Sequence, residues 1–307
     1  MAPPIAAPGL RWLELTPDYR CNQRCVGCGA VSEGGPSLSA GAMVSSMRDA
    51  RRDGAAQLWI GGGEPTLRRD LLPLVREARA QGFARIRLQT NAAMLAYPEV
   101  ARRLAEAGVT ELAVSIKGPD AATHDRMARS EGAFDLLCRG IESARSHGLA
   151  VEGDVLAYRS TTSLLPEIVR TFAARGITRF RVWMMAPSEG DAEALAEEPR
   201  WSEVARAVRE TLALSLSDEP DHLLSLHTPP CTLDDDAARA RFFAPELGLL
   251  VHDASGRRFP LESSDIEGGA FPPACDGCEL RPRCNGVRAA YVVRHGDAEL
   301  RPRRPVG

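Results

Sequence analysis

Residues 51–60 read RRDGAAQLWI, a helix-forming stretch that ends at a glycine and is followed closely by a short apolar strand. The same order recurs in four later segments: RAQGFARIRL (79–88), AEAGVTELAV (105–114), RSHGLAVEGDVL (145–156) and AARGITRFRVWMM (173–185). A glycine that ends a helix adopts the left-handed conformation that other residues avoid. We therefore expect five helix-to-strand units whose helices end at Gly54, Gly82, Gly108, Gly148 and Gly176.

The repeat indicates a parallel α/β sheet. Residues 11–15 (RWLEL) form the opening strand, so that six strands alternate with helices, and the longer spacing before Gly148 leaves room for an extra helical turn at residues 120–127. Strands joined through crossover helices run parallel, with right-handed connections. Both an open, doubly wound sheet and a barrel satisfy this pattern, and in both the ligands bind beyond the carboxyl ends of the strands.

Four distinctive motifs fall at those carboxyl ends. They are CNQRCVGC (21–28), GGGEPT (61–66), QTN (89–91) and SIKG (115–118), at the ends of the first, second, third and fourth strands. We therefore expect four separate loops to converge on one site. In the second loop, Gly62 and Gly63 allow a ligand to approach the backbone closely, and Glu64 offers a carboxylate that suits the ammonium group of an α-amino acid. Taken alone, a tight strand-to-helix turn explains this loop better.

Composition excludes several classes of partner. The net charge of −3 provides no basic surface for nucleic acid, and Lys117 is the only lysine, a bias that we attribute to codon usage. No apolar run reaches the ~20 residues that span a bilayer, and the amino terminus has no signal-peptide pattern. We therefore expect a cytoplasmic protein without membrane or nucleic-acid partners, whose eight cysteines serve metal binding or catalysis rather than disulfides.

Together, the four motifs resemble those of the radical S-adenosylmethionine (radical SAM) enzymes over residues 10–190. The resemblance implies a partial (β/α)6 TIM-type barrel. It also implies a [4Fe–4S] cluster on Cys21, Cys25 and Cys28, with one iron free of cysteine that S-adenosylmethionine chelates through its amino and carboxylate groups. Many members carry an aromatic residue just before the third cysteine, where this chain has Gly27, so the contacts to adenine are expected to differ.

The resemblance also implies contacts between the protein and S-adenosylmethionine. We expect Gly62, Gly63 and Glu64 to meet the methionine amino group, and Ser115 to contact the ribose or the carboxylate. The further candidates at the same edge are Thr90, Asn91, Asp154 and Arg159. The last two follow or end the fifth strand, where a surface-loop role is an equal alternative. Residues 183–185 end the sixth strand and are candidates for pocket lining or for barrel core.

A second cysteine group lies near the carboxyl end, in CDGCELRPRC (275–284). Its C-x2-C-x5-C spacing resembles the SPASM extension of radical SAM enzymes or its shortened form, twitch, although Arg288 stands where the full pattern has a further cysteine. Four cysteines close one [4Fe–4S] cluster, so we expect a single auxiliary cluster on Cys231, Cys275, Cys278 and Cys284. The alternatives are a structural zinc ribbon, or a substrate that binds the open iron in place of Cys231. Cys138 is isolated and is interpreted as a structural thiol.

These features predict a radical SAM enzyme with three parts: a flexible amino terminus (1–9), a radical SAM (β/α)6 core (10–215) and a SPASM/twitch-like auxiliary-cluster region (216–307). By resemblance, such an enzyme cleaves S-adenosylmethionine reductively to a 5′-deoxyadenosyl radical, which abstracts a hydrogen atom from the substrate. No acid, base or nucleophile is assigned among the side chains, because the cofactor carries the radical.

The resemblance favours modification of a ribosomally made peptide or natural product. A small-molecule biosynthetic enzyme that oxidises an alcohol or cyclises a nucleotide is the alternative. A non-catalytic iron–sulfur or zinc scaffold for electron transfer or redox sensing explains the cysteines but not the Gly-Gly-Glu loop. One expected partner is a low-potential electron donor of the flavodoxin or ferredoxin type. Because the first strand begins near residue 10, a peptide substrate is expected to need either a separate leader-peptide-binding protein or recognition by the barrel itself.

Overall fold

The computed structural model describes residues 9–28, 35–187, 190–217, 219, 221–264 and 266–304. Within these residues, one sheet has the strand order β7-β6-β5-β4-β3-β2-β1-β8-β9. The first six strands are β1 (Trp12–Leu15), β2 (Gln57–Ile60), β3 (Arg85–Thr90), β4 (Glu111–Ile116), β5 (Ala150–Ala157) and β6 (Phe180–Met184). They pair in parallel with one another, as the repeat predicts.

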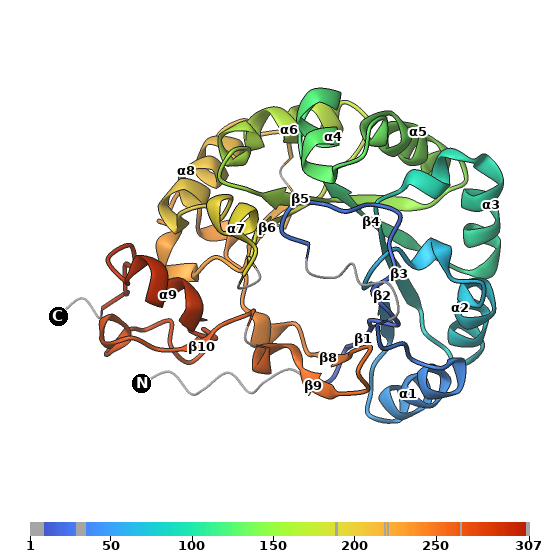
Figure 1. Ribbon diagram of the computed structural model, residues 1–307. Helices are drawn as coiled ribbons and strands as arrows, with labels where there is room; N and C mark the ends of the chain where they lie inside the picture. Colours follow the sequence, from blue (N-terminus) through green and yellow to red (C-terminus); the bar gives the residue numbers. More distant parts are fainter. Residues whose placement is uncertain are drawn as a thin grey trace.

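The crossover helices lie on the outside of this sheet (Figure 1). They are α1 (Ala40–Arg52), α2 (Leu71–Ala80), α3 (Pro98–Ala107), α5 (Ala133–Ser146), α6 (Leu165–Ala173) and α8 (Trp201–Leu212). The connections also contain the short helices α4 (Ala121–Ala128), before α5, and α7 (Ala192–Ala196), before α8. The five predicted glycines all have a positive φ, between 78° and 114°, which confirms the left-handed turn after each helix. Within the described ranges, no helix combines the length and the apolar character that crossing a membrane requires.

The sheet curves into an incomplete barrel with strands inside and helices outside, and the expected partial TIM-type barrel fits this arrangement (Figure 1). Apolar side chains between the two layers form the main core, with Leu13, Leu58 and Ile86 among its fully enclosed members. Because successive strand residues point to opposite faces, their neighbours Glu14 and Trp59 face the interior of the barrel. This interior is called the lumen below.

Three further strands of the sheet come from the carboxyl-terminal part of the chain. β7 (Leu223–Leu226) extends the sheet beside β6. β8 (Leu249–His252) pairs in parallel with β1 and carries the antiparallel strand β9 (Arg258–Pro260) on its other side. The sheet therefore has strands at both edges that the sequence pattern did not predict. The expected domain boundary at residue 215 crosses this sheet, and the division stays a prediction.

The last residues of the described chain form a small unit beside α8. It contains the strand pair β10 (Gly269–Ala270) and β11 (Val287–Arg288) and the helix α9 (Ala289–His295). The ring of Tyr291 stacks on Trp201 with the ring centroids 3.8 Å apart, and the Tyr291 hydroxyl donates to Glu299 at 2.6 Å. Buried contacts of this kind join the unit to the barrel wall.

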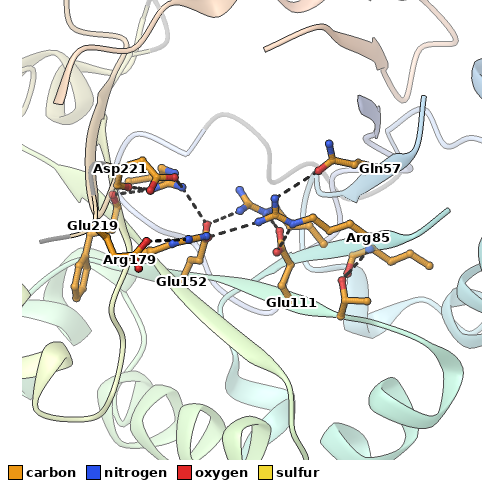
Figure 2. A network of polar contacts seen from close by, with 12 residues as sticks. Gln57, Arg85, Glu111, Glu152, Arg179, Glu219 and Asp221 are labelled. Carbon is orange, nitrogen blue, oxygen red and sulfur yellow. Dashed lines mark hydrogen bonds and ion pairs between the residues drawn. The ribbon is translucent and has the colours of Figure 1, made fainter. Parts of the chain in front are cut away.

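A network of charged side chains lies at the amino-terminal ends of the barrel strands and is called the charged layer below (Figure 2). Arg87, which is 5% exposed, donates to Glu111 at 2.5 Å and also to Glu152. Arg85 donates to the second oxygen of Glu111 at 2.5 Å, and Arg179 lies 3.8 Å from Glu152. Buried charges are tolerated here because each carboxylate has more than one guanidinium partner. This layer lies at the opposite end of the strands from the four motifs.

Candidate active site

A cavity of about 510 Å³ opens at the carboxyl ends of the strands and is called the reaction cavity below. Its wall holds residues from all four motifs, among them Cys21, Cys25, Cys28, Gly62, Gly63, Glu64, Gln89, Thr90, Asn91 and Ser115. Trp183, Met184 and Met185 from the end of β6 also line it. The fold therefore brings the four loops around one space, as expected for parallel strands that end at the same edge.

Hydrogen bonds position the loop that carries the first three cysteines. The Gln23 N–H donates to Cys21 Sγ at 3.4 Å, and Asn91 Nδ2 donates to Asn22 Oδ1 at 2.7 Å. Burial raises the pKa of the Cys21 thiol to about 11, so this sulfur ionises readily only when a cation binds it. Among the described residues, no three His, Cys, Asp or Glu side chains gather at the spacing of a single metal ion. The assignment of the three cysteines as cluster ligands therefore stays a prediction from their sequence spacing.

The departure at Gly27 has a packing explanation. Gly27 has φ 68°, and a Cβ at this position would lie 3.0 Å from the sulfur of Met185. Met185 belongs to a small buried cluster with Val26, Met127 and Tyr158. Met185 therefore fills the space beside position 27 that a larger side chain would need.

The glycines of the second motif pack against the first loop. A Cβ on Gly62 would lie 2.5 Å from the carbonyl oxygen of Asp18, and one on Gly63 would lie 2.1 Å from that of Arg20. The backbone N–H groups of Gly63 and Glu64 donate to the same two carbonyls at 2.9 and 2.7 Å. These glycines are thus required by the contact between two loops, which positions the start of the cysteine loop. Their contact with a methionine amino group stays a prediction.

The carboxylate of Glu64 is the centre of a buried hydrogen-bond network. One oxygen accepts from the Thr66 N–H at 3.1 Å, the Thr66 hydroxyl at 2.6 Å and the Thr90 hydroxyl at 2.8 Å. The other oxygen accepts from the Asn91 N–H at 2.8 Å. Burial raises the pKa of Glu64, and these hydrogen bonds oppose that shift. The carboxylate therefore joins the ends of β2 and β3, and its second oxygen retains acceptor capacity for a ligand.

The other predicted contacts with S-adenosylmethionine are not all brought together. Ser115 lines the reaction cavity at the end of β4. Asp154 is fully buried in β5 outside the cavity lining, where Gln89 Nε2 donates to its Oδ2 at 3.1 Å and burial raises its pKa to about 6. Arg159 is exposed, and its backbone N–H donates to the carbonyl of Glu197 at 2.8 Å. The roles of Asp154 and Arg159 stay predictions.

Several residues in or near the cavity were missed by the sequence analysis. His227 lies just after β7 in a left-handed conformation (φ 61°) that is uncommon for a residue with a side chain, and its Nε2 is 2.9 Å from Glu267 Oε1. Glu14 lies in the lumen, where burial and the charge of Glu267 raise its pKa to about 7. No local sequence pattern marks His227, Glu14 or Glu267. Lys117 also lines the cavity, and its position in the SIKG motif was a usable signal.

The second cysteine group surrounds a separate, smaller cavity. The four cysteines in its wall are Cys231, Cys275, Cys278 and Cys284. Burial raises the pKa of Cys231 and that of Cys284, the latter to about 11. Arg288 is buried and donates to the carbonyl of Met185 at 3.3 Å, so it links this region to the end of β6. Folding thus brings Cys231 to the C-x2-C-x5-C loop, whereas its ligation of a cluster stays a prediction.

Comparison with known proteins identifies the class of the core. Residues 16–163 match the model of the Radical SAM superfamily, so the chain contains a radical SAM domain. Proteins of this family use a [4Fe–4S] cluster together with S-adenosylmethionine.

Curated relatives match only part of the chain. A probable GTP 3′,8-cyclase of Methanopyrus kandleri is 35% identical over 167 residues, which cover 53% of each chain. The PqqA peptide cyclase of Rhodopseudomonas palustris is 31% identical over 55% of this chain and 45% of its own length. The mycofactocin maturase MftC of Mycobacterium tuberculosis is 33% identical over 58% of this chain and 45% of its own length. The chain spans about half the length of the curated relatives it matches.

Solved structures resemble the chain over nearly its whole length. Streptococcus suis SuiB bound to S-adenosylmethionine has a TM-score of 0.70 at 15% identity. The match covers 97% of this chain and 77% of the SuiB chain. The protein anSMEcpe with bound AdoMet and a peptide has a TM-score of 0.64 at 12% identity. The match covers 96% of this chain and 93% of the anSMEcpe chain. At these identities, the likeness establishes the fold alone.

The residues present fit the two groups that the family uses. Three cysteine thiols stand in the cavity wall, which suits a cluster with one iron left open. The adjoining Glu64 carboxylate is suited to an ammonium group, and the cavity of about 510 Å³ lies within the range of small-molecule sites.

Proposed function

We propose that this chain is a radical SAM enzyme that binds a [4Fe–4S] cluster through Cys21, Cys25 and Cys28 and holds S-adenosylmethionine in the reaction cavity. The observation that carries the proposal is the common cavity wall formed by the three cysteines, the Glu64 loop, Thr90, Asn91 and Ser115. A scaffold that only stores or transfers electrons needs no such cavity beside its cluster. The matched Radical SAM domain supports the same conclusion.

In this proposal the side chains bind and orient, and the bound groups react. When bound, the cluster and S-adenosylmethionine supply a 5′-deoxyadenosyl radical that abstracts a hydrogen atom from the substrate. The second oxygen of Glu64 would accept a hydrogen bond from the methionine amino group, while Thr66, Thr90 and Asn91 keep the carboxylate in place. Asn91 also donates to Asn22, so a single residue couples the cofactor-binding end of β3 to the cysteine loop.

We further propose that the substrate is a ribosomally made peptide or a related natural product. Two curated relatives are named as a peptide cyclase and a mycofactocin maturase, and SuiB has been solved with its precursor peptide SuiA, although at 14% identity that likeness shows the fold alone. The second candidate is nucleotide cyclisation, which the 35% identity to a probable GTP 3′,8-cyclase favours.

The auxiliary cluster belongs to the same proposal. The four cysteines that line the second cavity are placed to bind one further [4Fe–4S] cluster, with Cys231 as the ligand from outside the C-x2-C-x5-C loop. A SPASM/twitch-like character of residues 216–307, a flavodoxin- or ferredoxin-type electron donor and a separate leader-peptide-binding protein remain predictions from the sequence.

One experiment tests the central claim. The protein is reconstituted with iron and sulfide without oxygen, reduced, and incubated with S-adenosylmethionine, and 5′-deoxyadenosine is measured. We expect product formation with about eight irons per chain, since two four-iron clusters are proposed. A Cys25→Ala variant serves as the inactive control. Zinc in place of iron, together with no 5′-deoxyadenosine, would contradict the proposal.

A further inference from the structure

Lys117 is the only lysine of the chain and occupies an unusual place in the fold. It directly follows Ile116, the last residue of β4, and lines the reaction cavity while being only 3% exposed. An ammonium group loses much of its hydration in such a position, which costs free energy unless another charge replaces the lost water.

Among the described residues, no acidic side chain forms an ion pair with Lys117. The backbone N–H of Lys117 donates to His124 Nδ1 at 3.2 Å, but among the described residues the side-chain ammonium has no hydrogen bond or ion pair. The neighbouring His124 cannot supply a negative charge, since an imidazole is either neutral or positive. Burial and then the proximity of Lys117 lower its pKa to about 3, so this imidazole is neutral. Within the part of the chain that the structure describes, Lys117 therefore lines the cavity wall without a partner of opposite charge.

Two other buried cations, Arg87 and Arg68, show the contrast. Arg87 contacts Glu111 and Glu152, and the largely buried guanidinium of Arg68 lies 2.6 Å from Asp18 and 2.8 Å from Asp70. These arginines are paired within the protein and lie outside the reaction cavity lining. Lys117 differs in both respects, which indicates that its partner enters from the cavity.

We propose that Lys117 is the binding site for an anionic group, a carboxylate or a phosphate, of a molecule held in the reaction cavity. Lysine acts on such groups as a point charge with three donors. The inference deepens the proposed function, on which the identity of the cavity depends. Two molecules are candidates for supplying the anionic group: S-adenosylmethionine, through its carboxylate, and the substrate, through an acidic group. The experiments below distinguish these two candidates.

The first measurement is direct binding to the anaerobically reconstituted enzyme by calorimetry. The probes are S-adenosylmethionine, its decarboxylated analogue, inorganic phosphate and pyrophosphate. A hydrogen bond to a charged group corresponds to about tenfold or more in affinity.

If Lys117 binds the methionine carboxylate, Lys117→Met weakens the binding of S-adenosylmethionine about tenfold and leaves the binding of the decarboxylated analogue unchanged. If it binds a substrate anion, Lys117→Met abolishes phosphate or pyrophosphate binding and leaves S-adenosylmethionine unchanged. Lys117→Arg, which keeps the charge, retains binding in both cases.

The second measurement uses the uniqueness of this lysine. Reductive methylation followed by mass spectrometry of the peptide that contains Lys117 reports how fast its amine reacts. With a probe at about ten times its Kd, an anion bound at Lys117 slows the reaction about tenfold, because only the unoccupied fraction reacts. The protecting probe must be the one whose binding Lys117→Met loses.

The proposal is overturned if Lys117→Met binds all four probes as the unchanged protein does. Its failure is distinct from failure of the proposed function: 5′-deoxyadenosine formation together with unchanged binding in Lys117→Met rejects the anion site alone. Loss of anion binding in Lys117→Met without any 5′-deoxyadenosine from the unchanged protein rejects the enzyme proposal and keeps the anion site.

Discussion

The backbone N–H of Asn91 donates to the carboxylate of Glu64 at 2.8 Å, while the side chain of Asn91 donates to Asn22 in the cysteine loop at 2.7 Å. Three of the four loops around the reaction cavity are therefore connected through one residue. The position of the cysteines depends on this network as well as on their spacing in the sequence.

Replacing Glu64 with glutamine tests that network. The glutamine amide presents an N–H group where the carboxylate accepts hydrogen bonds from Thr66, Thr90 and Asn91, so at least one buried donor loses its partner. We expect the free energy of unfolding to fall by about 1–3 kcal/mol in urea denaturation, together with weaker binding of S-adenosylmethionine. Glu77→Gln is the matched control, because Glu77 accepts from Gln81 on the surface of α2. Equal stability of the two variants would show that the network contributes little.

A methyl group at Gly63 tests the contact between the second motif and the cysteine loop. Its Cβ would lie 2.1 Å from the carbonyl oxygen of Arg20, so Gly63→Ala displaces the residues that lead into the loop. We expect reconstituted iron to fall to about half as only the first cluster is lost. Gly41→Ala is the control, because Gly41 lies on α1 with no atom closer than 4.0 Å to the added carbon. Full iron loading of Gly63→Ala would count against this account.

Exchange of Cys231 for alanine tests the ligand set of the second cavity. If Cys231 closes an auxiliary cluster, the variant binds fewer irons or a more labile cluster, whereas the first cluster is retained. Cys138→Ala provides the comparison, since Cys138 lies on α5 outside both cavity linings. Iron content and visible absorption after anaerobic reconstitution give the answer. Unchanged spectra and cluster lifetimes in Cys231→Ala would show that Cys231 does not bind the fourth iron, and that another ligand, such as a substrate, does.

Removal of the Arg87 charge tests the charged layer. Arg87→Met leaves Glu111 and Glu152, both buried, with reduced charge compensation. We expect a loss of about 3–5 kcal/mol in the free energy of unfolding, as for other buried ion pairs that lose one partner. In Arg102→Met, which removes an exposed arginine that pairs with Glu99 and Glu106 on α3, thermal denaturation should show little change. Similar melting temperatures for both variants would contradict a structural role of the layer.

The buried carboxyl of Glu14 predicts a specific pH dependence of stability. Burial and then the charge of Glu267 raise its pKa from 4.5 to about 7. The folded protein therefore holds a proton that the unfolded chain releases, so this group costs nothing below pH 4.5 and becomes destabilising as the pH rises toward 7. Glu14→Gln should match the unchanged protein at low pH and exceed its stability by up to about 3 kcal/mol above pH 7. Parallel stability curves across this range would show that Glu14 titrates normally.

Much of the central architecture was predictable because its signals are local. The glycines after the helices and the alternation of helix with strand identified the six parallel strands. Whether they form an open sheet or a barrel was left undecided, since both satisfy the same local rules. The edge strands β7 to β9 were missed because they lie beyond the repeated order of helix, glycine and strand and acquire their identity by pairing.

The residues of the candidate site also fall into two groups, those that the sequence predicted and those that only the structure revealed. The sequence selected the three cysteines of the first loop, the Glu64 loop, Thr90, Asn91 and Ser115 for two reasons. Each motif stands at the end of a predicted parallel strand, where such ends share one edge, and together the motifs resemble those of the radical SAM enzymes. Only the tertiary structure showed that Gly62 and Gly63 pack against residues 18–20, and that His227 lines the reaction cavity. Caps, periodicity and motif spacing act over a few residues, whereas these contacts arise when the sheet curves. The pairing of β1 with β8 joins residues more than 200 positions apart, and no local pattern encodes which side chains then share the lumen.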